Sequence, residues 1–209
     1  MTAAPLTIDS QNRRRHLSPV VLLTRPASTA DAEQLASLAE AAFRRTYEGI
    51  IEAETIDAVV AQACTPASFL RLLAAHGARP SLNRVLVATD GAGLLGFLDF
   101  AEEDDGLELR RLYTRVGDTS RGVGAALLGE LESGLPPGTR YRIVVVPQNT
   151  RGLGFWQRHG FRVRGEVDGF HHFRTHRGVG LDATSASPKL LVLDRTVVEV
   201  RAGGAEQRT

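Results

Sequence analysis

The chain has 209 residues, of which 43% are hydrophobic and 23% charged, and its formal net charge is +1 at pH 7. This length suits one domain with a sizeable core, and the balanced charge gives no reason to expect nucleic acid or an acidic membrane as partner. The single cysteine, Cys64, excludes an internal disulfide. No apolar run approaches the roughly 18 residues of a membrane span, so we expect a cytoplasmic protein.

The N-terminal half predicts a strand followed by helices. Residues 1–18 lack apolar periodicity and are expected to form a flexible tail. The run "PVVLLTRP" is typical of a strand that stops at Pro26, and Ser28 or Thr29 can cap the helix that follows. A second helical region is expected in two pieces, with Pro66 in the first turn of the later one.

The middle of the chain predicts a hairpin and then a strand–helix–strand unit. In "RVLVATDGAGLLGFLDF" the pair Asp90-Gly91 indicates a hairpin turn. The next strand, "GLELRRLYTRV", changes its apolar phase near Arg110-Arg111, which suits a β-bulge or an exposed edge. A helix with an apolar face follows, and then the continuous apolar run "YRIVVVPQN", which is typical of a buried parallel strand.

The C-terminal part predicts a short helix in "TRGLGFWQRHG", a strand from about Phe161, a polar insertion and a last strand in "KLLVLDRTVVEV". Residues 201–209 are expected to form a second flexible tail. The pattern indicates one mixed α/β domain over residues 19–200.

Two glycines, Gly122 and Gly124, open the central helix in "DTSRGVGAALLGELE". Glycine costs a helix about 1 kcal/mol relative to alanine, so its use at this position needs a reason. The free N–H groups of a helix start suit a phosphate, and small residues let it approach; close packing of the helix on a strand is the alternative. The pattern is neither a Walker A loop nor a dinucleotide fingerprint.

The context of these glycines resembles the GNAT superfamily of N-acetyltransferases. That family has the signature Gln/Arg-x-x-Gly-x-Gly/Ala between its fourth strand and third helix, where this chain has "TSRGVG". Downstream, "NTRGLGFWQRHGF" is similar to the second signature, with Asn149, Phe155, Gly160 and Phe161 at matching positions. The resemblance covers about residues 19–200 and implies a central mixed sheet with splayed fourth and fifth strands, flanked by helices.

The resemblance also implies an acetyl-CoA site. The backbone N–H groups from Arg121 to Ala125 would hold the pyrophosphate, and the pantetheine would run beside the backbone of Leu112 and Thr114. The cosubstrate site expected from the resemblance comprises Leu112, Tyr113, Thr114, Thr119, Ser120, Arg121, Gly122, Val123, Gly124, Ala125, Asn149, Phe155 and Trp156.

Two positions depart from the family pattern. Thr119 stands where Gln or Arg is usual, and Trp156 stands where many members have the tyrosine proposed to protonate the leaving thiolate. An indole N–H is not a usable acid near neutral pH. Because a thiol of pKa about 8.5 leaves readily as thiolate, water or Tyr113 can serve as the substitute acid.

A general base is also expected, because a lysine-like amine is only about 0.1% neutral near pH 7.4. Glu108 lies four residues before Leu112, and by position it resembles the catalytic glutamate of the histone-acetyltransferase branch. The alternative is a strand carboxylate paired with Arg110 or with a neighbouring strand.

The histidines of "FHHFRTH" (His171, His172 and His176) have no supporting carboxylate or cysteine at a ligand spacing, so no metal site is predicted. The leading hypothesis is acetyl transfer to a primary amine, small-molecule or peptide, by direct attack in a ternary complex. A non-catalytic acyl-CoA-binding module is the alternative, and a homodimer is a family tendency. The acceptor is not readable from the sequence.

Overall fold

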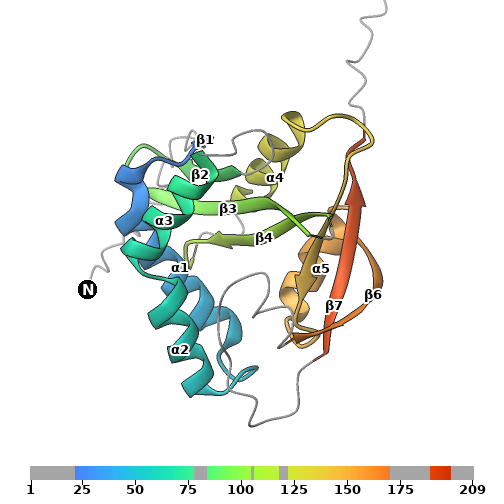
Figure 1. Cartoon of the computed structure of the whole chain (residues 1–209), viewed down its shortest axis with the longest axis horizontal. Helices are drawn as coiled ribbons and strands as arrows, with labels where there is room; N and C mark the ends of the chain where they lie inside the picture. The colour runs from blue at the N-terminus through green and yellow to red at the C-terminus, as the bar shows by residue number, and fades with distance from the viewer. Residues whose placement is uncertain (1–21, 78–83, 105, 118–121, 170–188, 199–209) are drawn as a thin grey trace, which may run out of the picture.

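The computed structural model describes residues 22–77, 84–104, 106–117, 122–169 and 189–198. The two predicted tails lie outside these ranges. Within them, seven strands form one mixed sheet in the order β1-β2-β3-β4-β5-β7-β6 (Figure 1). The strands are β1 Leu23–Pro26, β2 Arg84–Thr89, β3 Leu94–Glu103, β4 Gly106–Thr114, β5 Arg140–Val145, β6 Arg162–Asp168 and β7 Lys189–Thr196.

Helices cover both faces of the sheet. They are η1 Thr29–Asp31, α1 Ala32–Tyr47, α2 Ala53–Ala63, α3 Pro66–Gly77, α4 Val123–Ser133 and α5 Thr150–Arg158. Helices α1, α2 and α3 share a core with one side of β2 and β3. Helices α4 and α5 share the other core with β3, β4, β5 and β7. The predicted mixed α/β fold is confirmed, as are the break at Pro66 and the hairpin at Asp90-Gly91.

The predicted bulge in β4 is confirmed as well. Asp99 of β3 lies opposite Arg111, whereas Phe100 lies opposite Leu109, so Arg110 is the extra residue. Leu109 before the bulge and Leu112 after it lie on the same side of the sheet, in or against the core that β4 shares with α4 and α5. The phase change in the sequence therefore reports the inserted residue.

Strands β4 and β5 are parallel neighbours, joined by α4, and every other neighbouring pair in the sheet is antiparallel. Their register is defined by Glu108 opposite Arg142. Figure 1 shows β5 and β7 turned away from the direction of β3 and β4. The sheet therefore opens along the last residues of β4, as the splayed strands of the predicted fold require.

The first strand–helix junction is held by an ion pair. The Asp31 carboxylate accepts hydrogen bonds from Arg25 at 2.8 Å and from the Ser28 backbone N–H at 2.7 Å. The Arg25 guanidinium, and then the Ser28 donors, hold the pKa of Asp31 at about 2, although burial opposes the shift. This geometry confirms Ser28 as the predicted cap.

No single helix within the described residues is long and apolar enough to cross a membrane. Helices α2 and α3 reach that length and composition only as a pair, and they bend by 56° at their junction. Both contribute buried side chains to the core under α1, including Val59 and Phe69. Cys64, between them, is buried in the same core.

Candidate active site

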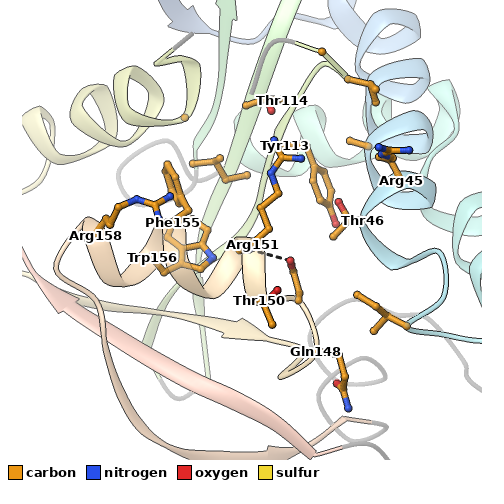
Figure 2. A pocket seen from close by; sticks show the side chains of 18 residues that line it. Arg45, Thr46, Tyr113, Thr114, Gln148, Thr150, Arg151, Phe155, Trp156 and Arg158 are labelled. Atoms are coloured by element: carbon orange, nitrogen blue, oxygen red, sulfur yellow. Dashed lines mark hydrogen bonds between the residues drawn. The ribbon is translucent and has the colours of Figure 1, made fainter. Parts of the chain in front are cut away.

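A cavity of about 650 Å³ lies where the sheet opens (Figure 2). Three groups of residues line it: the end of α1 and the link that follows, the last residues of β4, and the start of α4 together with α5. The lining residues are Ala42, Arg45, Thr46, Ile50, Leu112, Tyr113, Thr114, Val116, Gly117, Gly124, Gln148, Asn149, Thr150, Arg151, Gly152, Phe155, Trp156 and Arg158. Seven of the predicted site residues are thus brought together in one place.

The backbone of β4 presents hydrogen-bonding groups to this cavity. The Arg115 N–H donates to the Leu95 carbonyl of β3 at 2.7 Å, and the Tyr113 carbonyl also faces β3, beside Gly96. Because alternate residues of a strand direct their backbone groups to opposite edges, the N–H and C=O groups of Leu112 and Thr114 are directed to the open edge. An extended chain in the cavity can pair with them as an added strand does.

The start of α4 supplies a second set of donors. Gly122 is the N-cap residue, with φ of +77°, and its carbonyl accepts from the Ala126 N–H at 2.9 Å. The N–H groups of Val123, Gly124 and Ala125 precede the first intrahelical bond. They suit an anion. Thr119, Ser120 and Arg121, which the resemblance also assigns to the cosubstrate, lie outside the described residues.

The two glycines have different structural reasons. Gly122 has a left-handed backbone conformation that a side chain would strain, and a Cβ there would meet nothing within 4 Å. A Cβ on Gly124 would lie 3.1 Å from the Phe155 ring and 3.3 Å from Leu112 Cδ2. Gly124 therefore also serves close packing, which was the alternative reason for a glycine here, and it brings α4, α5 and β4 together at the cavity.

Helix α5 is held at its first turn by the predicted second signature. The Asn149 side chain accepts from the Gly152 N–H at 2.9 Å, and a Cβ on Gly152 would lie 2.6 Å from Asn149 Nδ2. Asn149 thus caps the helix. Phe155 and Trp156 pack edge-to-face with centroids 4.8 Å apart, and Trp156 is 5% exposed. Both rings line the cavity.

The charged side chains that line the cavity are Arg45, Arg151 and Arg158, and none of its described lining residues is acidic. Figure 2 shows Arg158 beside Phe155 on α5, whereas Arg45 extends from the opposite wall, on α1. The cavity therefore has a positive lining at both ends.

The two predicted catalytic residues differ in position. Tyr113 lines the cavity, and Figure 2 shows its ring extending toward the side of Thr46. Glu108 is 0% exposed, does not line the cavity, and accepts two hydrogen bonds of 3.1 Å from Arg142 of β5. Arg110, its other predicted partner, pairs with Glu103 at 2.5 Å. The geometry thus supports the pairing of Glu108 with a neighbouring strand, and its role as base stays a prediction.

Sequence reasoning missed Arg45 on the α1 wall of the cavity, and it left the partner of the buried Glu108 open. Arg45 has no motif around it, and no sequence signal distinguishes it from its neighbour Arg44, which does not line the cavity. His171, His172 and His176 lie outside the described residues, as does the polar insertion.

No protein-family model matches the chain. Spermidine N(1)-acetyltransferase of Thermoplasma acidophilum is 27% identical to it over 147 residues, which cover 69% of this chain and 90% of the relative. The crystal structure of PaiA N-acetyltransferase from the same organism, in complex with coenzyme A, matches with a TM-score of 0.65 at 22% identity, over 84% of this chain and 99% of that chain. YncA, a putative acetyltransferase from Salmonella typhimurium solved with acetyl-CoA, matches with a TM-score of 0.58 at 16% identity, over 88% and 99%.

The parallel pair of β4 and β5, the open edge of β4 and the likeness to these solved structures show the GNAT fold. In sequence the chain is similar to the Thermoplasma N-acetyltransferase, as the motifs predicted.

Proposed function

We propose that the protein transfers an acetyl group from acetyl-CoA to a primary amine within this cavity. The observation that carries the proposal is the convergence of three donor sets on one cavity: the open edge of β4, the start of α4 and the arginines of α5. Two of the similar solved structures contain coenzyme A or acetyl-CoA. The three donor sets of this cavity suit such a ligand, which has phosphates, a long polar arm and a thioester.

Each part of the chain has a role in this proposal. The N–H groups at the start of α4 and Arg158 bind phosphate oxygens. The edge groups of Leu112 and Thr114 hold the pantetheine arm, and the Leu112 N–H polarises the thioester carbonyl. Phe155 and Trp156 form the apolar side of the channel and exclude water. We include Thr119, Ser120 and Arg121 in the phosphate site on the resemblance alone.

The reaction is a direct attack in a ternary complex. The neutral amine nitrogen forms a bond to the thioester carbon, the carbon–sulfur bond breaks, and the electron pair leaves with the thiolate sulfur. The amine loses one proton. Tyr113 is the proposed proton donor to the thiolate, with water as the alternative, because its hydroxyl is the acidic group that β4 brings to the cavity.

The proton on the attacking amine has two routes away. Glu108 is the predicted acceptor, through water, since its carboxylate does not reach the cavity directly. The charge of the cavity lining is the second route. Its described residues include arginines and no carboxylate, so an ammonium ion is disfavoured there and the pKa of a bound amine is lowered.

The test is calorimetric titration with acetyl-CoA of the unmodified protein and of two matched variants. Gly124→Leu places a side chain against Phe155 and Leu112, whereas Gly129→Leu makes the same change in the same helix where a Cβ meets nothing within 4 Å. We expect the unmodified protein and Gly129→Leu to bind acetyl-CoA with micromolar affinity and Gly124→Leu to lose this binding. The unmodified protein should bind acetyl-pantetheine, which lacks the nucleotide phosphates, at least 100-fold more weakly than acetyl-CoA.

Absence of acetyl-CoA binding to the unmodified protein would contradict the proposal. Binding without turnover of any amine would instead support the non-catalytic acyl-CoA-binding module. Tighter binding of a nucleotide than of coenzyme A would point to a nucleotide site. The homodimer and the cytoplasmic location stay predictions, to be checked by light scattering and by cell fractionation.

A further inference from the structure

The α1 wall of the cavity has no role in binding the coenzyme as proposed above. Its residues, Ala42, Arg45, Thr46 and Ile50, come from the last turns of α1 and the link to α2. Helices α4 and α5 belong to the core on the other side of the sheet. A ligand that lies along α4, α5 and the edge of β4 therefore leaves the α1 wall to the second substrate.

Two neighbouring arginines at the end of α1 differ in their partners. Arg44 is paired with Glu40 at 3.0 Å and with Asp57 of α2 at 2.6 Å. Arg45 is exposed, lines the cavity, and makes no ion pair or side-chain hydrogen bond within the part of the chain that the structure describes. Both complement the helix dipole, so the dipole does not explain the difference. Arg45 keeps its charge available to a ligand.

The polarity of this wall argues against a polycation as acceptor. A polyamine such as spermidine, named in the similar Thermoplasma enzyme, needs carboxylates to bind its remaining ammonium groups. The described lining of this cavity offers arginines instead. An anion on the acceptor would meet a guanidinium that can bind it with two parallel hydrogen bonds.

We propose that the acceptor is a primary amine that carries a carboxylate, and that Arg45 is the specificity-determining residue that binds this group. Figure 2 shows Arg45 and Thr46 on the wall that faces Phe155 and Trp156, with Tyr113 between the walls. The Thr46 hydroxyl is a second donor beside Arg45. With the carboxylate held on α1, the amine of the same molecule is directed toward the β4 edge, where the thioester lies. This inference rests on the proposed acetyl transfer.

The test measures thiol release from acetyl-CoA with matched pairs of acceptors. Each pair is an amino acid or dipeptide and its C-terminal amide, so that the amine is kept and the carboxylate is removed; spermidine completes the panel. In the unmodified protein we expect kcat/KM for the carboxylate member to exceed that for its amide by about tenfold or more.

The variants Arg45→Gln and Arg44→Gln are compared on the same pairs. We expect Arg45→Gln to abolish the preference for the carboxylate, mainly through KM, so that the two members of each pair react with similar kcat/KM. Arg44→Gln, one residue away, should keep the preference, because the Arg44 guanidinium is already paired with two carboxylates and does not line the cavity. Calorimetry should show unchanged acetyl-CoA affinity in both variants.

The inference is overturned if spermidine or the amides react as well as the carboxylate members, or if Arg45→Gln leaves the preference intact. Either result would leave acetyl transfer itself established. Failure of acetyl-CoA to bind would overturn the proposed function as well, so the two failures are distinguishable.

Discussion

The two faces of the central sheet are built by different means. On the α4–α5 face, glycines and aromatic rings make an apolar wall: Gly124 fits against Phe155, and Trp156 packs on Phe161 with centroids 5.0 Å apart. The α1–α3 face buries charges, with Asp99 paired to Arg111 of the neighbouring strand. Apolar packing tolerates small adjustments, whereas a buried charge depends on one partner. We therefore expect the two faces to respond differently to single substitutions.

The largest effect is expected from Arg111→Met. The Arg111 guanidinium donates to Asp99 Oδ2 at 3.0 and 2.8 Å and lies 5.0 Å from the centroid of the Phe69 ring. The Asp99 side chain is 1% exposed. Removing the cation leaves a buried carboxylate without its counterion, which should lower the free energy of unfolding by about 4 kcal/mol. Urea denaturation measures this loss.

The control is the double variant Asp99→Leu with Arg111→Met. Replacing both members of a buried ion pair by apolar residues is often close to neutral, so the double variant should recover at least half of the lost stability. A loss below about 1 kcal/mol for Arg111→Met alone would show that this face does not depend on the pair.

The second largest effect on stability is expected from Glu108→Gln. This variant tests whether Glu108 has a structural role or a catalytic role. The variant removes the negative charge from the pair with Arg142, whose side chain is 19% exposed, and we expect a loss of about 3 kcal/mol in stability. If pairing is the main role of Glu108, kcat at a temperature where the protein stays folded should fall by less than about tenfold.

The control for this variant is Arg142→Gln, which breaks the same pair and keeps the carboxylate. A loss of 100-fold or more in kcat for Glu108→Gln, together with loss of the acidic limb of the pH–rate profile and near-normal activity of Arg142→Gln, would establish Glu108 as the base.

Gly96→Ala tests how closely α4 approaches the sheet. A Cβ on Gly96 would lie 2.7 Å from Val123 Cγ1 and 2.8 Å from the Tyr113 carbonyl oxygen. The backbone oxygen cannot move aside without shifting β4, so we expect a loss of about 2 kcal/mol in stability and weaker acetyl-CoA binding. Gly93→Ala in the same hairpin is the control, because its nearest atom, Gln34 Oε1, is 3.6 Å away. Equal behaviour of the two variants would contradict the close approach.

Most of the fold could be predicted because the signals are local. The hairpin turn, the helix break at Pro66 and the phase change at Arg110 each depend on a few adjacent residues. The α4–α5 side of the cavity, where we propose that the coenzyme binds, is marked in the sequence for the same reason, since its glycines and aromatic residues lie in two short signatures around Gly124 and Phe155.

The buried ion pairs of the sheet and the place of Arg45 in the cavity could not be predicted in this way. Asp99 and Arg111 are 12 residues apart, Glu108 and Arg142 are 34 apart, and these pairs exist only because strand register sets them opposite or beside each other. Nothing near Arg45 in the sequence indicates that it lines the cavity while Arg44 does not. Which of several arginines pairs with a given carboxylate depends on the tertiary structure and not on the local sequence.

The smallest expected effect is a gain, and it separates the two roles of glycine in α4. Gly129 is exposed in the middle of the helix, and a Cβ there meets nothing within 4 Å. Gly129→Ala should therefore raise the free energy of unfolding by about 0.5 to 1 kcal/mol and the Tm by about 1 to 4 °C, by removing the helix penalty of glycine. Gly124→Ala removes the same penalty but places its Cβ 3.1 Å from the Phe155 ring. It should give no gain and should weaken acetyl-CoA binding, whereas an equal gain from both variants would show that the ring yields freely and that Gly124 is not required for packing at the cavity.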